Sequence, residues 1–139
     1  MFFLGKKPKP AAKAAATATV RGQVAEDQAL AYLQARGLRL LARNYRTPGR
    51  GGGEIDLILQ ESDGTVVFVE VRSRRSSSFG GAGASIGAGK RQRVVLAAQH
   101  WLLQQGAGGR ACRFDVVLLQ GAQLQWLAGA FEADGGGVT

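Results

Sequence analysis

Apolar and polar positions follow two different periods along the chain, and these periods predict two helices and five strands. Apolar residues recur at helical spacing over residues 20–36 and 90–105, which predicts two amphipathic helices. Shorter apolar or alternating runs predict five strands, at residues 38–45, 55–60, 65–72, 112–119 and 123–127. A hairpin joins the second strand to the third, and a helix separates the third from the fourth, so antiparallel and parallel pairing are both expected. The predicted fold class is α/β, with a mixed β-sheet flanked by helices in αβββαββ order.

The segments outside these elements divide the chain into an arm, one domain and a tail. Residues 1–19 are rich in Ala, Lys, Pro and Thr and are expected to form a flexible basic N-terminal arm. Residues 20–131 form the predicted domain, whose length suits a single hydrophobic core, and residues 132–139 a flexible C-terminal tail. Inside the domain, the glycine-rich segments 47–53 and 73–89 predict loops, and the second is long enough to be functional or disordered.

The hairpin between the second and third strands determines which side chains share a face of the sheet. Its turn spans residues 61–64, and a three-residue loop with the glycine in the left-handed conformation would place Asp56 directly opposite Glu70. Glu54 and Arg72 would share that face, because side chains alternate along a strand. A two-residue loop would shift this register. The opposite face is wholly apolar and is expected to be the core, formed by Ile55, Leu57, Leu59, Val67, Val69 and Val71.

The expected pair of Asp56 and Glu70 needs a partner of opposite charge. Carboxylates that face each other across two strands repel and destabilise the sheet. A hard cation such as Mg²⁺ would offset this repulsion, since it typically binds one or two protein carboxylates together with substrate phosphates. Two alternatives are a solvent-screened pair at a wet edge and a salt bridge from Arg72 to Glu70. Glu26 lies on the apolar stripe of the first helix, so it is either a third carboxylate of the site or a half-exposed residue at the margin of the stripe.

The charge of the chain favours a polyanionic partner. Eighteen Lys and Arg against ten Asp and Glu give a net charge of +8. Four of the lysines lie in residues 1–19, so the rest of the chain carries fourteen basic and ten acidic side chains. The candidate contacts to nucleic acid flank the hairpin in sequence, and they are Arg46, Arg50, Arg74, Arg75, Lys90, Arg91 and Arg93. Such contacts would position a phosphate backbone without reading its bases, whereas the alternative is a solvated face paired with carboxylates.

Cysteine usage and the distribution of apolar residues predict a cytoplasmic protein with no membrane partner. Cys112 is the only cysteine, so no internal disulfide can form, and we expect a buried thiol in a reducing compartment. No apolar run approaches the roughly 20 residues that a membrane span needs. Residues 1–10 place their short apolar part before their basic part, which is the reverse of a secretory signal.

Four segments carry a specific combination of motifs. They are GEIDLI at residues 53–58, FVEVRSR at 68–74, KRQR at 90–93 and RFDVV at 113–117. In this order and spacing they resemble the YraN-type family of predicted endonucleases. That family belongs to the PD-(D/E)xK nuclease superfamily and is similar to archaeal Holliday-junction resolvases. The resemblance covers about residues 20–119 and implies a restriction-endonuclease-like core.

The resemblance also implies roles for individual residues. Asp56 and Glu70 would be the metal-binding acids, with the Val71 carbonyl as a further ligand and Mg²⁺ or Mn²⁺ as the metal. Glu26 would be the auxiliary acid of the first helix.

Further nucleic-acid contacts and the function follow from the same resemblance. Arg21, which precedes Glu26 as in the first-helix motif of the resolvases, and Gln92 join the candidate nucleic-acid contacts. The implied function is that of a metal-dependent endonuclease that hydrolyses phosphodiester bonds in nucleic acid, with branched or flapped DNA as the expected substrate. Because the resolvases work as dimers, a homodimer is the state that this analogy suggests.

Arg72 departs from the pattern of the superfamily, which has a lysine at this position. Arginine is effectively never deprotonated, whereas a buried lysine can lose its proton. Arg72 could hold a phosphate oxygen with its guanidinium fork and stabilise charge in the transition state. Three possibilities follow: the metal alone generates the hydroxide, Lys90 moves into the site, or the enzyme is slow or inactive. The last leads to an alternative function, a non-catalytic nucleic-acid-binding domain on a nuclease scaffold.

Overall fold

The fold is an α/β arrangement whose element order agrees with the predicted one. A computed structural model describes residues 13–49, 52–74, 87–106 and 110–132. The elements are α1 (Lys13–Ala35), β1 (Arg39–Arg46), β2 (Glu54–Gln60), β3 (Val66–Arg74), α2 (Ala88–Gln104), β4 (Cys112–Gln120) and β5 (Gln123–Phe131). In this part of the chain, neither helix is both long and apolar enough to cross a membrane.

The five strands form one mixed sheet in the order β1-β2-β3-β4-β5. Strand β3 pairs with β4 in parallel, and the other three pairings are antiparallel. A parallel pair needs a long crossover, which α2 supplies between β3 and β4. The predicted mixed sheet with one helical crossover is therefore confirmed.

The β2–β3 hairpin has the predicted register. The Glu61 amide donates to the Thr65 carbonyl at 2.9 Å, and Gly64 has φ +95°, so the loop has three residues and a left-handed glycine. Leu57 pairs with Val69, which is the pairing that this loop dictates. The regular ladder ends at this pair, so Asp56 and Glu70 lie directly beyond it.

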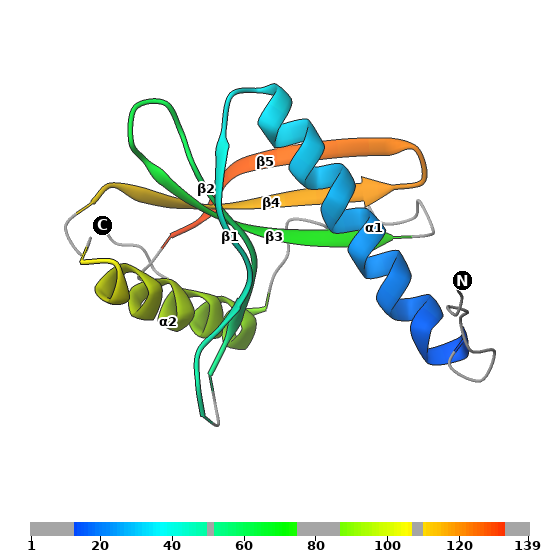
Figure 1. Cartoon of the computed structure of the whole chain (residues 1–139), viewed down its shortest axis with the longest axis horizontal. Helices are drawn as coiled ribbons and strands as arrows, with labels where there is room; N and C mark the ends of the chain where they lie inside the picture. Colours follow the sequence, from blue (N-terminus) through cyan, green and yellow to red (C-terminus); the bar gives the residue numbers. More distant parts are fainter. Residues whose placement is uncertain (1–12, 50–51, 75–86, 107–109, 133–139) are drawn as a thin grey trace, which may run out of the picture.

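The two helices cover opposite faces of the sheet (Figure 1). Helix α1 packs on Leu57 and Val69, and α2 packs on Ile58 and Phe68. The prediction that only one face of the hairpin forms the core is wrong, because α2 buries the second face over its apolar middle. Ile55 also belongs to the cluster beneath α2, although it was predicted to lie on the Leu57 face.

Helix α1 begins at Lys13, seven residues before the predicted start at Val20. Residues 13–19 were expected to belong to the flexible arm, but alanine, the strongest helix former, dominates this segment and extends the helix through it. Residues 1–12 of the predicted arm and residues 133–139 of the predicted tail lie outside the described residues. Most of the predicted loop 73–89 lies outside them as well.

Candidate active site

Asp56 lies just beyond the regular pairing of β2 with β3 and turns its carboxylate toward the backbone of β3. Its Oδ2 atom accepts a hydrogen bond from the Val71 amide at 2.8 Å. Loss of hydration raises the pKa of Asp56 to about 7, and the charges of Glu70 and Glu26 add to this, whereas the Val71 amide and Lys90 oppose it. Asp56 is thus a carboxyl group that is half-protonated near neutral pH when no metal is bound.

Glu70 is the more deeply buried of the two acids, with 7% of the residue exposed. Lys90, in the first turn of α2, places its Nζ atom 2.8 Å from Glu70 Oε2. The other oxygen, Oε1, is buried and has no hydrogen-bond partner among the described residues. Burial raises the pKa of Glu70, while Lys90 and then Arg72 act against that rise. Glu70 therefore keeps one oxygen that no protein group satisfies in the described part of the chain.

Glu26 projects from α1 toward the same region of the sheet. Its charge is close enough to raise the pKa of Asp56. Asn44 donates from Nδ2 to both Glu26 oxygens, at 3.1 and 3.3 Å, and the Arg43 Nε atom lies 3.5 Å from Oε1. Glu26 is therefore an anchored neighbour of the pair. The sequence analysis did not identify Asn44 as a partner of Glu26. Asn44 adopts the left-handed conformation, with φ +51°, which asparagine tolerates better than most residues.

Arg72 is half-buried on β3, where its charge opposes the rise in the pKa of Glu70 that burial causes. The predicted alternative of a salt bridge on Glu70 is realised by a different residue, because the described ion pair comes from Lys90. Lys90 was expected to contact nucleic acid or to move into the site. The structure places the Lys90 side chain beside Glu70, and both expectations remain predictions.

The carboxylate pair suits a hard cation that keeps several water or substrate ligands. Within the described ranges, no group of three or more His, Cys, Asp or Glu side chains is placed to hold a metal ion. Asp56 and Glu70 contribute two carboxylates, and the unpartnered Oε1 of Glu70 is an oxygen in need of a positive charge. Mg²⁺ is usually bound in this way, through one or two carboxylates together with waters and phosphate oxygens. The residues present therefore fit Mg²⁺ or Mn²⁺.

The remaining candidate nucleic-acid contacts are only partly placed. Arg46, at the end of β1, has a side chain that is 72% exposed and lies 3.5 Å from Glu54. Residues 91–93 follow Lys90 on α2, where Gln92 and Arg93 are exposed and Arg91 is half-buried. The backbones of Arg21 and Arg74 lie in α1 and β3, but their side chains lie outside the described residues, as do Arg50 and Arg75 entirely. The start of α2 is thus the basic segment that the structure joins to the carboxylates.

Gly53 brings the start of β2 against the first turns of α2. A Cβ atom added at Gly53 would lie 2.1 Å from the Arg93 carbonyl oxygen, a distance that no packed carbon adopts. The same loop is closed by the Gly53 amide, which donates to Thr47 Oγ1 at 2.9 Å. Gly53 therefore permits the close approach that places α2, with Lys90, next to the strand of Asp56.

Gly53→Ala is expected to lower the free energy of unfolding by about 2 kcal/mol, because the new methyl group forces α2 away from the strand. Gly89→Ala is the matched control, since a Cβ atom at that helical position meets nothing within 4 Å. The control is expected to be neutral or stabilising, by about 0.5 kcal/mol. Urea denaturation of the three proteins measures both effects, and equal stabilities of Gly53→Ala and wild type would contradict the packing argument.

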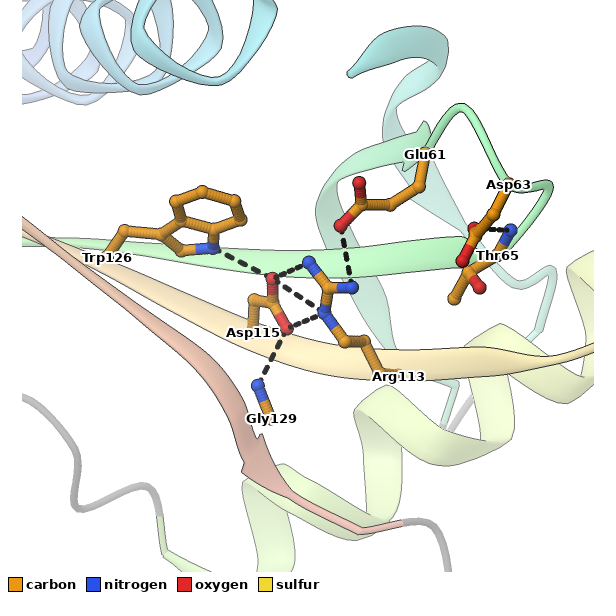
Figure 2. A network of polar contacts seen from close by, with 7 residues as sticks. All are labelled: Glu61, Asp63, Thr65, Arg113, Asp115, Trp126 and Gly129. Carbon is orange, nitrogen blue, oxygen red and sulfur yellow. Dashed lines mark hydrogen bonds and ion pairs between the residues drawn. The ribbon is translucent and has the colours of Figure 1, made fainter. Parts of the chain in front are cut away.

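A second polar cluster is centred on Asp115 and has a structural role (Figure 2). Asp115 pairs with Val69, so its side chain leaves the sheet on the face opposite to that of Glu70. Asp115 is fully buried and accepts hydrogen bonds from Arg113 Nε at 3.0 Å, from Trp126 Nε1 at 2.8 Å and from the Gly129 amide at 2.9 Å. Asp115 therefore links β4 to β5 through the interior of the domain. Cys112, at the start of the same strand, is exposed, although it was predicted to be buried.

The mixed five-stranded sheet, its two helices and the carboxylates on its central hairpin define an α/β protein compatible with a restriction-endonuclease-like core. Residues 25–119 match the family described as "Uncharacterised protein family UPF0102", and the chain belongs to this family. UPF0102 is the YraN-type family of predicted endonucleases, so the resemblance in the motifs is confirmed.

Relatives in the same family are similar over nearly their whole length. A UPF0102 protein of Acidovorax sp. (strain JS42) is 62% identical over 133 residues, which cover 96% of this chain and 99% of the relative. A UPF0102 protein of Paracidovorax citrulli is 62% identical over 135 residues, with the same two shares. A UPF0102 protein of Verminephrobacter eiseniae is 60% identical over 139 residues, covering 94% of this chain and 96% of the relative.

Proposed function

We propose that this protein is a metal-dependent endonuclease that hydrolyses phosphodiester bonds in DNA. The observation that carries the proposal is the pair of half-buried Asp56 and buried Glu70, in which Glu70 Oε1 has no protein partner among the described residues. Two neighbouring carboxyl groups with raised pKa values reduce the stability of the fold, so their presence is best explained by a ligand of opposite charge. Membership of a nuclease-like family supports the same conclusion.

Asp56 and Glu70 would hold the metal, and the Val71 carbonyl is a further candidate ligand. A bound Mg²⁺ or Mn²⁺ ion would lower the pKa of a coordinated water molecule and neutralise charge on the scissile phosphate. The Val71 amide orients the Asp56 carboxylate by donating to Oδ2 at 2.8 Å.

The arginines of the site would act on the substrate rather than on the water. Arg72 carries a planar fork of donors, which can hold two phosphate oxygens and stabilise the charge that develops on them. Arg46, Gln92 and Arg93 are exposed and can contact neighbouring phosphates. These contacts carry no base-specific information, so the proposed enzyme recognises the shape or branching of DNA rather than a sequence.

A second candidate function is binding of nucleic acid without cleavage. The contact between Lys90 and Glu70 favours it, since a cation of the protein itself already satisfies one carboxylate oxygen. The two functions differ in one property, because the binding domain would need no divalent metal.

The test is a cleavage assay on forked, four-way-junction and single-stranded DNA with Mg²⁺, with Mn²⁺ and with a chelator. Wild type is expected to cut in either metal and to be inactive with the chelator. Glu70→Gln is expected to bind Mn²⁺ at least about tenfold more weakly in calorimetry, because it loses one of the two anionic ligands.

The matched control is Glu61→Gln, at the far end of the hairpin. Glu61 pairs with Arg113 at 2.8 Å and belongs to the structural cluster, so this variant is expected to bind Mn²⁺ and cut DNA as wild type does. Salt-dependent DNA binding without metal uptake would favour the second function. Equal cleavage by wild type and Glu70→Gln would refute the proposal.

A further inference from the structure

Lys90 is chemically unlike the other cations near the site. It is the only lysine after Lys13, and every other basic residue beyond that position, apart from His100, is an arginine. Lysine carries a compact charge on a flexible stem, whereas arginine has a rigid planar fork that is suited to a fixed bidentate contact. A lysine at this position is therefore suited to contacts that change during a reaction.

The two side chains of the Lys90–Glu70 ion pair differ in their exposure to solvent. The Glu70 side chain is 8% exposed, while that of Lys90 is 41% exposed. Lys90 thus reaches from solvent to one oxygen of a buried acid. Because the stem of Lys90 is partly free, its ammonium group can leave this oxygen without any rearrangement of the sheet.

We infer that Lys90 and the divalent metal compete for Glu70, so that metal binding displaces the Lys90 ammonium group, which then becomes available to a DNA phosphate. The inference rests on the proposed function and adds to it a contact between Lys90 and DNA that forms only when the metal is bound. Lys90 offsets the charge of Glu70 in the metal-free protein, where a buried carboxylate without a partner would be costly. A cation bound to the same carboxylate removes the attraction that holds Lys90 and replaces it with repulsion.

Displacement would couple metal loading to substrate binding. Before loading, Lys90 is bound to Glu70 and contributes little positive charge to the surface. After loading, its ammonium group lies beside the start of α2, where Arg91 and Arg93 are also placed. The inference therefore predicts that Lys90 contributes to DNA affinity only when the metal is bound.

The first test measures Mn²⁺ affinity by calorimetry at pH 8 for wild type, Lys90→Met and Arg110→Met. Lys90→Met is expected to bind Mn²⁺ about tenfold more tightly than wild type, since the competing charge is gone. Arg110→Met removes the same charge at the opposite end of the hairpin, where Arg110 donates to the Gly64 carbonyl, and is expected to match wild type. Lys90→Gln, which can still donate a hydrogen bond to Glu70, serves if Lys90→Met does not fold.

The second test measures DNA affinity with Ca²⁺, which fills a hard-cation site without supporting cleavage, and with a chelator. With Ca²⁺, Lys90→Met is expected to bind DNA about threefold or more weakly than wild type, which corresponds to the loss of one phosphate contact. With the chelator, the two proteins are expected to bind DNA equally. Mn²⁺ binding that is unchanged or weaker in both Lys90 variants would overturn the inference and leave the proposed function intact. Failure of wild type to bind Mn²⁺ would instead overturn the proposed function, and the inference with it.

Discussion

Asp56→Asn is expected to abolish cleavage and at the same time to stabilise the metal-free protein at pH 8. Cleavage should fall by about a hundredfold or more, since asparagine is a weaker ligand without the charge that a hard cation needs. Stability should rise because asparagine keeps an acceptor for the Val71 amide while removing a poorly hydrated negative charge. The opposite signs of the two effects would identify Asp56 as a residue retained for function.

The stabilisation is expected to depend on pH in one direction. Asp56 has a pKa of about 7 in the folded protein, against an ordinary value of 3.8. Between these values the folded protein holds a proton that the unfolded chain has released, so wild-type stability falls as pH rises through this window. The asparagine side chain of the variant does not titrate, so the variant is expected to exceed wild type by on the order of 2 kcal/mol at pH 8 and to match it near pH 4.

Urea denaturation at pH 4, 6 and 8, with and without Mn²⁺, measures these differences, and the cleavage assay supplies the activity. Saturating Mn²⁺ at a hundred times its dissociation constant is expected to stabilise wild type by about 2.7 kcal/mol and to have little effect on the variant. Asp63→Asn is the matched control, because Asp63 is an exposed loop residue whose pKa is lowered by its contacts with Thr65. A variant less stable than wild type at pH 8 would contradict the argument.

The hairpin that carries the site could be predicted from its local sequence. A three-residue loop with glycine at its last position fixes the register of both strands, so Leu57 had to face Val69. The position of Asp56 beside Glu70 follows from that register. Residues in one hairpin are close in sequence, and their relative placement depends on little else.

The packing of α2 on the polar side of the hairpin could not be predicted in the same way. Ile58 and Phe68 lie on the same strands as the acids, and only the position of α2 shows that they are buried core residues. The position of α2 depends on the close approach of the two segments at Gly53. One glycine among several in a loop does not indicate such an approach from sequence alone. The sequence pattern identified the apolar face beneath α1 apart from Ile55, but it could not show that the sheet is covered on both sides.

The ion pair between Lys90 and Glu70 depends on the same tertiary contact. Twenty residues separate the two in sequence, and neither strand pairing nor helix periodicity relates them. The resemblance in the motifs placed both residues near a common site. The structure adds the direct contact between them.

Asp115→Ala is expected to be among the most destabilising single substitutions in the domain, lowering the free energy of unfolding by about 3 kcal/mol or more. The ladder between β4 and β5 is irregular between Phe114 and Val116, where a single residue of β4 faces a longer stretch of β5. The Asp115 carboxylate fills this irregularity by accepting from the Gly129 amide and from Trp126 Nε1. Alanine would leave both donors without a partner inside the protein.

The charge of Asp115 adds to the expected loss. Asp115 is fully buried, and Arg113 is its counter-ion at 3.0 Å, so the substitution also leaves Arg113 to pair with Glu61 alone. Asp63→Ala removes an exposed aspartate from the nearby hairpin loop, where its side chain accepts from the Thr65 amide, and should cost far less. Thermal and urea denaturation of the two variants compare the sites. Because Asp115 and Glu70 point to opposite faces of the sheet, Mn²⁺ affinity should be preserved where Asp115→Ala remains folded. Weakened Mn²⁺ binding in the folded variant would show that the two polar clusters are coupled.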